Sequence, residues 1–273
     1  MRICVFSKHF QALDFKELGR TLKKLGVNGV DLTVREGGHI EPAEAKDKLP
    51  EAAEILKENG VEITMITTNI TSIDSPYASD ILETSAKLGI KYFKLGYFFY
   101  SGFGNLRKDI AEAKAKLKSL EPLCLQLGIK GGYHNHSGNF LGASIPHILK
   151  MIEDCNPEWI GVYYDIGHAT IEGGYAGWKM NLEEVADRLF MVAVKDLTFI
   201  PRAGDDWGWR VEVVPLGEGL VDWKGFVRCL KSIGFNGPFS IHSEYDLPVE
   251  EVIEQTRKDI AFLRGIFASI EKD

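Results

Sequence analysis

Leu127-Gly128-Ile129-Lys130-Gly131-Gly132-Tyr133-His134-Asn135 is a stretch in which a helix pattern gives way to a strand pattern. An amphipathic run typical of a helix ends at its first residue, and a short run typical of a strand covers 129–135. Gly128 stands between them, where glycine takes the left-handed conformation that ends a helix and releases the chain into a strand. The same junction occurs at three further glycines: Gly26, Gly60 and Gly89.

Short runs rich in β-branched or aromatic residues alternate with amphipathic runs along the whole chain. The predicted strands are 3–7, 29–33, 62–69, 92–96, 129–135, 160–165, 190–196 and 239–244, and the clearest predicted helices are 14–25, 42–59, 107–127 and 249–270. Neighbouring parallel strands need crossover helices, so this alternation implies a parallel sheet. Eight such units predict a (β/α)₈ TIM barrel that fills residues 1–273 as one domain.

An open doubly wound sheet is the alternative architecture. It would require a glycine-rich phosphate turn after the first strand, and Phe6-Ser7-Lys8-His9-Phe10-Gln11 stands there instead. No linker or low-complexity stretch divides the chain, and the predicted loops at 101–105 and 201–211 are modest. The barrel is therefore the preferred prediction.

Composition narrows the functional classes. The chain has 32 basic and 39 acidic residues, and this balance argues against a nucleic-acid surface, which needs a concentrated basic face. Its four cysteines are scattered without zinc-binding spacing, so we expect them to be reduced. The N-terminus shows no charged-then-apolar leader, and no apolar run approaches the length that crosses a bilayer. We expect a cytoplasmic protein that acts on a small molecule, without membrane or nucleic-acid partners.

The predicted strand ends carry an unusual concentration of polar side chains. In TIM barrels the working residues lie at the carboxyl ends of the strands and in the loops that follow. Five of the seven histidines fall at such ends. Alternation places His134 and His136 on one face of their strand, and His242 and Glu244 on one face of the last strand. Polar groups in a barrel mouth are costly unless they are paired, metal-bound or in contact with substrate. The candidates are Arg35, His39, Asn69, Lys94, His134, His136, Asp165, His168, Lys195, Glu244 and Tyr245.

Motifs at these positions resemble those of a known family. They are Tyr133-His134-Asn135-His136, Asp165-Ile166-Gly167-His168, Lys195-Asp196, Gly217-Glu218-Gly219 before Trp223, Gly237-Pro238 and His242-Ser243-Glu244-Tyr245. Their order resembles the sugar phosphate isomerase/epimerase group of xylose isomerase-like barrels, which includes tagatose/psicose 3-epimerases and inosose dehydratases. The resemblance covers essentially the whole chain.

The resemblance implies a divalent cation, often manganese, held by Glu, Asp, His and Glu from strands five to eight. Asp165 and Glu244 match the Asp and the last Glu, and His134 stands where the first Glu usually does. Ala193 occupies the position of the ligand histidine, which is a departure from the family pattern. The predicted metal ligands are therefore His134, Asp165 and Glu244, with Mn²⁺ as the expected ion and Mg²⁺, Co²⁺ or Zn²⁺ as alternatives. The ammonium of Lys195 could instead take the cation's place.

The leading functional hypothesis is a sugar or sugar phosphate isomerase or epimerase that transfers a proton next to a carbonyl. The expected catalytic residues are Glu244 as base, His134 on the opposite face of the substrate, and Lys195 as a cation. The substrate-binding candidates are Arg35, His39, Asn69, Lys94, His136, His168 and Tyr245, where His168 resembles a substrate-contacting histidine of the epimerases.

Two other functions fit the same pattern. A lyase would begin with the same proton abstraction from a keto-sugar or keto-inositol and then expel a β-hydroxyl. A sugar-binding barrel without catalysis would account for Ala193. In either case Trp207, Trp209 and Trp223 could provide a wall for sugar stacking, although Trp223 opens a predicted helix and equally suits the core. Apolar positions along 260–270 would suit contact with a second copy of the chain.

Overall fold

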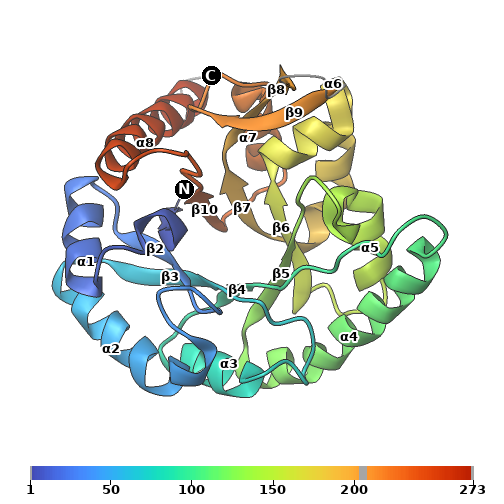
Figure 1. Ribbon diagram of the computed structural model, residues 1–273, viewed down its shortest axis with the longest axis horizontal. Coiled ribbons are helices and arrows are strands. Elements are labelled where there is room, and N and C mark those ends of the chain that lie inside the picture. Colours follow the sequence, from blue (N-terminus) through green and yellow to red (C-terminus); the bar gives the residue numbers. More distant parts are fainter. Residues whose placement is uncertain (1, 203–207, 272–273) are drawn as a thin grey trace.

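A computed structural model describes residues 2–202 and 208–271 and has the predicted barrel architecture (Figure 1). The sheet is closed, with the strand order β1-β10-β7-β6-β5-β4-β3-β2, and every pairing within it is parallel. The strands are β1 (Arg2–Phe6), β2 (Gly29–Thr33), β3 (Glu62–Thr67), β4 (Tyr92–Lys94), β5 (Lys130–His134), β6 (Ile160–Asp165), β7 (Leu189–Val194) and β10 (Pro238–Ile241). The predicted fold class is confirmed.

Helices form a ring around the barrel (Figure 1). They are α1 (Phe15–Lys24), α2 (Ala45–Glu58), α3 (Ala78–Lys87), α4 (Leu106–Leu127), α5 (Ile145–Ile152), α6 (Ile166–Glu184), α7 (Trp223–Ser232) and α8 (Val249–Glu271), with short 3₁₀ turns η1 (Ser7–Phe10), η2 (Pro42–Glu44), η3 (Leu141–Ala143) and η4 (Ala186–Arg188). The carboxylate of Asp14 caps α1, and Glu17 completes a capping box. Gly128 closes α4 with φ of 65°, as the junction pattern predicts.

The barrel interior is tightly filled. Met65, Tyr163 and Met191 belong to the apolar cluster that packs inside the ring of strands. A Cβ atom at Gly132 would collide with the methyl group of Met191, so a larger residue on β5 at this point would require the Met191 side chain to shift. The barrel therefore has a packed interior.

The predicted loop at 201–211 proved wrong in part, because a two-stranded antiparallel hairpin occupies this region. Its strands are β8 (Asp196–Pro201) and β9 (Trp209–Val214). The Asp196 carboxylate anchors the chain around it and accepts hydrogen bonds from the Trp223 indole at 2.8 Å and from the backbone of Gly217 and Val221.

The three tryptophans proposed as a stacking wall do not share one environment. Trp223 is buried and hydrogen-bonded to Asp196, whereas Trp209 is 62% exposed on β9. Trp207 lies outside the described residues. The core role of Trp223, left open by the sequence, is the one the structure shows.

Several other expectations concern the surface and the cysteines. All four cysteines are unpaired, in agreement with their scattered spacing. None of the helices described here combines the length and the apolar character needed to cross a membrane. Ile260, Leu263 and Ile270 on α8 are buried in the core of their own chain, so they offer little to a second copy. A homo-oligomer stays a prediction.

Candidate active site

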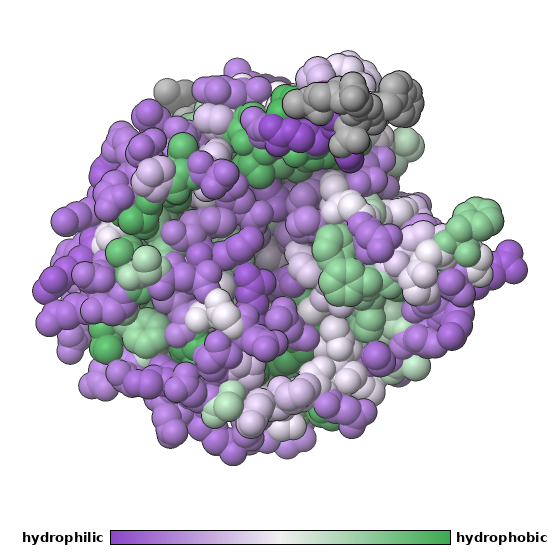
Figure 2. Space-filling view, viewed as in Figure 1, coloured by the Kyte–Doolittle hydropathy of each residue, from purple (hydrophilic) through white to green (hydrophobic). Residues whose placement is uncertain are grey.

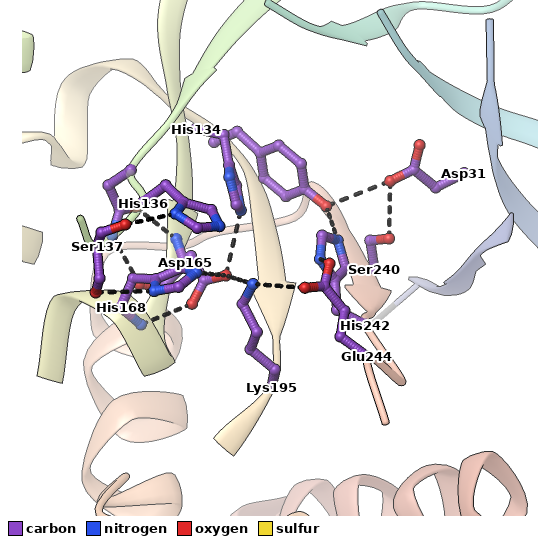
Figure 3. Close-up of polar contacts among 12 residues, drawn as sticks. Asp31, His134, His136, Ser137, Asp165, His168, Lys195, Ser240, His242 and Glu244 are labelled. Atoms are coloured by element: carbon purple, nitrogen blue, oxygen red, sulfur yellow. Dashed lines mark hydrogen bonds and ion pairs between the residues drawn. The ribbon is translucent and has the colours of Figure 1, made fainter. Parts of the chain in front are cut away.

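Buried polar side chains meet at the carboxyl ends of four barrel strands (Figure 3). His134 ends β5 and Asp165 ends β6, while Lys195 follows β7 and His242 follows β10. Their exposed fractions are 2%, 0%, 2% and 5%, respectively. Side chains this polar are rarely buried together unless they pair or hold a ligand. The structure thus brings together three of the predicted catalytic and metal-ligating residues, and adds His242.

Asp165 is the centre of this cluster. Its Oδ1 accepts the backbone N–H of His168 at 2.9 Å and so caps α6, while its Oδ2 lies 3.2 Å from Nε2 of His134 and 3.2 Å from Nζ of Lys195. Burial favours the neutral acid, but the Lys195 ammonium and the neighbouring imidazoles outweigh it and hold the pKa of Asp165 well below its usual value. Asp165 is therefore an ionised carboxylate in a dry setting.

The imidazole of His134 is neutral in this setting. Burial lowers the pKa of His134 to about 3, because the cost of desolvating an imidazolium exceeds the attraction of Asp165. Nδ1 of His134 lies 2.6 Å from the Oη atom of Tyr97, which fixes the ring, and Nε2 is turned toward Asp165. A neutral, oriented imidazole beside a carboxylate is the form in which histidine binds metals.

His242 completes a possible metal site. Its ring stacks on Phe6 with the centroids 4.4 Å apart, and its Nε2 lies 2.7 Å from the Oη atom of Tyr163. One ligand atom each from His134, Asp165 and His242 lie within 4.8 Å of one another. Two imidazoles and a carboxylate with open positions form a suitable donor set for a divalent ion.

Unsatisfied atoms point to the same place. Nε2 of His134, Oδ2 of Asp165 and Nδ1 of His242 have no hydrogen bond of acceptable geometry in the described part of the chain. Buried polar atoms without a partner are uncommon and often mark the place of an ion or a water. The residues present therefore fit a divalent cation, and the His/Asp/His set could bind one.

Glu244, the predicted third metal ligand, lies beside this triad. Its Oε1 is 3.6 Å from Nδ1 of His242, and its Oε2 is 3.7 Å from Nζ of Lys195. Burial alone raises the pKa of Glu244, but Lys195 and the neighbouring His242 outweigh it and lower the pKa well below the usual value. The two carboxylates in turn raise the pKa of Lys195 against the effect of its burial. Lys195 thus bridges Asp165 and Glu244. The sequence analysis gave this arrangement, with the ammonium in the place of a cation, as the alternative to metal binding.

A cavity of about 90 Å³ opens above the cluster. The predicted site residues that line it are Arg35, Lys94, His134, His136 and Glu244. The other lining residues were not predicted as site residues, and they are Phe6, Lys8, Thr67, Tyr97, Tyr163 and His242. Figure 2 shows hydrophilic side chains gathered around a hollow near the middle of the barrel. The cavity is smaller than most ligand pockets and is charged, which suits a small polar ligand.

Lys94 is the second buried lysine at the cavity. Its side chain is 3% exposed, and its Nζ lies 3.5 Å from the centroid of the Tyr97 ring without any hydrogen-bond partner in the described part of the chain. Burial, assisted by the nearby charge of Arg35, lowers the pKa of Lys94 well below its usual value. Unlike Lys195, Lys94 forms no ion pair within the described residues, and the charges of Asp31 and Glu244 only partly offset its burial.

His136 and His168 flank the cluster. Their ring centroids are 4.0 Å apart, and Nδ1 of His168 lies 2.9 Å from the Ser137 hydroxyl. Nε2 of His168 is 4.0 Å from Oδ2 of Asp165, so this ring stands at the edge of the proposed metal site.

Three predicted substrate-binding residues lie away from the cavity. The ring of His39 contacts the Thr33 hydroxyl and the Phe10 carbonyl, each at 3.2 Å. Asn69 is exposed and lines a separate pocket, and the hydroxyl of Tyr245 donates to the buried Asp259 at 2.8 Å. Their role in substrate binding stays a prediction that the geometry does not favour.

Two signals could have found His242 in the sequence. It stands at the end of the last strand, and it shares a face with Glu244. Tyr163 lies within β6 and points into the barrel, where an alternation argument alone cannot separate a functional phenol from a core aromatic.

The sequence pattern of the xylose isomerase-like TIM barrel family matches residues 20–266. An uncharacterized protein of Methanocaldococcus jannaschii is 28% identical over 131 residues, which are 47% of this chain and 41% of that protein. The inosose dehydratase of Geobacillus thermodenitrificans is 24% identical over 163 residues, which are 54% of this chain and 51% of the enzyme. These matches thus span about half the length of each relative or less.

Solved structures share the fold over nearly the whole chain. A D-tagatose 3-epimerase-like protein has a TM-score of 0.74 at 18% identity, with 100% of this chain and 99% of that chain covered. The 3-keto-D-glucoside 4-epimerase of E. coli has a TM-score of 0.73 at 17% identity, with 97% and 99% covered. The IOLI protein with a bound zinc atom has a TM-score of 0.72 at 17% identity, with 96% and 98% covered.

Proposed function

The chain belongs to the xylose isomerase-like TIM barrel family, and from this premise we propose that it is a metal-assisted isomerase or epimerase of a small sugar or sugar phosphate. One observation carries the proposal. The unsatisfied atoms of His134, Asp165 and His242 converge below a charged cavity that Glu244 borders. A donor set, a carboxylate base and a polar cavity are the parts that proton transfer next to a carbonyl requires.

His134, Asp165 and His242 would hold the ion. We propose Mn²⁺ as the metal, and the two imidazole ligands also suit Zn²⁺. A bound divalent ion supplies Lewis-acid polarisation of the substrate oxygens. Relatives support a divalent ion, since the IOLI structure contains zinc. Glu244 is not one of these three proposed ligands, so its carboxylate can act on the substrate.

Glu244 is the proposed base. Its lowered pKa keeps it ionised at neutral pH, and 21% of its side chain is exposed toward the cavity side of the cluster. The carboxylate takes the proton from the carbon next to the carbonyl, and Lys195, 3.7 Å away, orients it and balances its charge. An isomerase needs this one base, whereas an epimerase needs a second group on the opposite face of the substrate. The sequence analysis expected His134, three strands away around the barrel, in that second role, but its proposed role as a metal ligand excludes it from proton transfer.

Nitrogen donors around the cavity suit oxygen-rich substrates. Arg35 follows β2 and Lys94 ends β4, and both line the cavity together with Glu244. Guanidinium and amine groups donate hydrogen bonds to hydroxyl, carbonyl and phosphate oxygens. We propose that these two residues, with His136, bind the substrate.

Dehydration is the second candidate function. The inosose dehydratase match and the position of Lys195 beside Glu244 favour it, because a buried ammonium can protonate a leaving hydroxyl after the same proton abstraction. Product analysis separates the two: an unsaturated or diketone product indicates a dehydratase.

Hydrogen exchange tests the proposal. The purified protein is loaded with Mn²⁺ and incubated with a panel of ketoses, ketose phosphates and keto-inositols in D₂O, and loss of C–H signals is followed by NMR. We expect exchange in the wild type and a loss of about 10²- to 10⁴-fold in Glu244→Gln, the range for removal of an acid–base group. Glu250→Gln, at an exposed position that starts α8, is the matched control and should exchange like the wild type. Absence of exchange across the panel in metal-loaded protein would refute the function.

A further inference from the structure

A fully buried carboxylate inside the barrel is not used by the proposed chemistry. Asp31 on β2 is 0% exposed. Its Oδ1 accepts a hydrogen bond from the Thr67 hydroxyl at 2.8 Å, and its Oδ2 accepts one from the Ser240 hydroxyl at 2.9 Å. Burial of a carboxylate costs several kcal/mol unless other interactions compensate. The partners of Asp31 in the described part of the chain are hydroxyl groups, so its presence calls for a reason beyond packing.

Tyr163 links this carboxylate to the proposed metal site. Its Oη atom lies 3.3 Å from Oδ2 of Asp31 and 2.7 Å from Nε2 of His242. All three residues are buried, and they come from β2, β6 and the end of β10. The contacts therefore form one chain across the barrel that ends at a proposed metal ligand.

The single hydrogen of the phenol decides the direction of this chain. The carboxylate of Asp31 accepts from the Thr67 and Ser240 hydroxyls, and the Tyr163 hydroxyl also donates to its Oδ2, at 3.3 Å. The phenol oxygen is then an acceptor, and Nε2 of His242 must carry a hydrogen to fill the 2.7 Å contact. A neutral His242 with hydrogen on Nε2 leaves the lone pair on Nδ1. Nδ1 is the atom of His242 that has no hydrogen bond and lies nearest Glu244.

We propose that Asp31 is a positioning residue that acts through Tyr163 to hold His242 in the Nε2–H tautomer. Nδ1 is thereby kept unprotonated and aimed at the cluster, where it can bind a cation. Histidine ligands of metals commonly donate their other N–H to such a partner, which fixes the tautomer and the ring orientation. The assignment of a metal ligand to His242 rests on the proposed function, whereas the tautomer does not.

Nitrogen NMR of histidine-labelled protein tests the tautomer directly. The metal-free full chain is labelled with ¹⁵N at histidine, and His242→Gln identifies the signals of His242. We expect the wild type to carry the hydrogen on Nε2. Tyr163→Phe removes the acceptor and Asp31→Asn replaces an obligate acceptor by a group that also donates, so each should shift population toward Nδ1–H. Asp259→Asn is the matched control, because Asp259 is another buried carboxylate that accepts a tyrosine hydroxyl, at 2.8 Å from Tyr245, and it lies outside the cluster.

Calorimetric titration with Mn²⁺ and Zn²⁺ provides the second measurement. Removal of a partner of a metal-bound histidine typically weakens metal affinity about 10- to 100-fold, and we expect this loss in Tyr163→Phe and Asp31→Asn but not in Asp259→Asn. Circular dichroism identifies a variant that fails to fold, and the other variant then provides the test.

The outcomes separate the two proposals. An Nδ1–H tautomer in the wild type, or a wild-type tautomer retained in both folded variants, overturns the positioning role of Asp31. If the tautomer shifts as expected in the variants but the wild type binds neither Mn²⁺ nor Zn²⁺, the positioning role of Asp31 is supported. The metal-assisted mechanism of the proposed function is then refuted. If the wild type binds an ion and the affinities of the variants are unchanged, His242 is not a ligand and Asp31 does not act on the site.

Discussion

Replacement of Lys195 by methionine removes the one ammonium that bridges two carboxylates at the barrel mouth. Lys195 is 2% exposed and lies 3.2 Å from Oδ2 of Asp165 and 3.7 Å from Oε2 of Glu244. Methionine keeps most of the side-chain volume, so the change concerns charge more than packing. Asp165, which is 0% exposed, then remains as a buried charge without its main partner.

The expected magnitude follows from that burial. Removal of one partner of a buried ion pair typically costs about 3–5 kcal/mol. For a chain of roughly this size each kcal/mol lowers Tm by about 2–4 °C, so the metal-free variant should melt roughly 6–20 °C below the wild type. A divalent ion at about 100 times its Kd should raise the free energy of unfolding by about 2.7 kcal/mol. Metal should stabilise Lys195→Met more than the wild type, because the ammonium no longer competes with the ion for Asp165.

The pH dependence of this loss has a definite sign. The folded-state pKa of Asp165 lies below its unfolded value in the wild type, so its stabilisation is present above about pH 4 and is lost as the pH falls further. Without Lys195, burial dominates and favours the protonated acid. The difference in Tm between wild type and variant should therefore be largest near neutral pH. It should shrink as the pH falls, first above about pH 4, where the variant protonates Asp165, and then below about pH 4, where the wild type loses its stabilisation.

Lys94→Met is the matched control, since Lys94 is similarly buried but forms no ion pair with any carboxylate of residues 2–202 and 208–271. Its folded-state pKa lies below the unfolded value, so the unfolded chain binds more protons below about pH 10 and the wild type is penalised there. We expect Lys94→Met to leave Tm unchanged or to raise it. Differential scanning calorimetry of both variants, with and without Mn²⁺, is the assay. Equal shifts in the two variants, or no shift in metal-free Lys195→Met, would refute the reasoning.

Further predictions concern other parts of the same end of the barrel. Burial lowers the pKa of His9 to about 4. The folded protein should therefore lose stability as the pH falls from about 6.5 to about 4, because the unfolded chain binds a proton at His9 in this range and the folded chain does not. His9→Gln should flatten this part of the Tm–pH curve. Asp196→Ala leaves the Trp223 indole and several backbone N–H groups without an acceptor, and should cost about 3 kcal/mol or more in urea unfolding. Asp165→Asn should weaken Mn²⁺ binding by more than about 100-fold, because it removes a ligand rather than an outer partner. Calorimetric titration should show this loss, and an unchanged affinity would exclude Asp165 as a ligand.

The barrel was predictable because its signals are local. Helix-ending glycines such as Gly128 and short apolar strands repeat through the chain, and each unit can be identified from its own few residues. The hairpin of β8 and β9 was missed for the opposite reason. It packs outside the repeating pattern, and its anchor is a carboxylate, Asp196, whose partners lie more than twenty residues further along the chain.

The candidate site was predictable only as far as strand ends determine it. His134, Asp165, Lys195 and Glu244 follow from the rule that barrel strands end at the working face. Asp31 does not, since it lies within a strand whose five residues are all buried, and its contact with Tyr163 joins positions 132 residues apart. Such pairings depend on barrel closure and on the register of the strands, which a single sequence does not reveal.

Register also accounts for the departure at Ala193. Ala193 on β7 pairs with Ser240 on β10, and His242 lies two residues beyond Ser240, with its backbone N–H bonded to the Val194 carbonyl. Residues two apart on a strand face the same side, so His242 projects on the side of Ser240, one step closer to the mouth. We propose that the imidazole absent from β7 is supplied by the neighbouring strand, because one ligand atom each from His134, Asp165 and His242 lie within 4.8 Å of one another. Ala193→His tests this compensation: a histidine placed there should restore metal affinity to His242→Ala, and failure to do so would show that the two positions do not serve the same site.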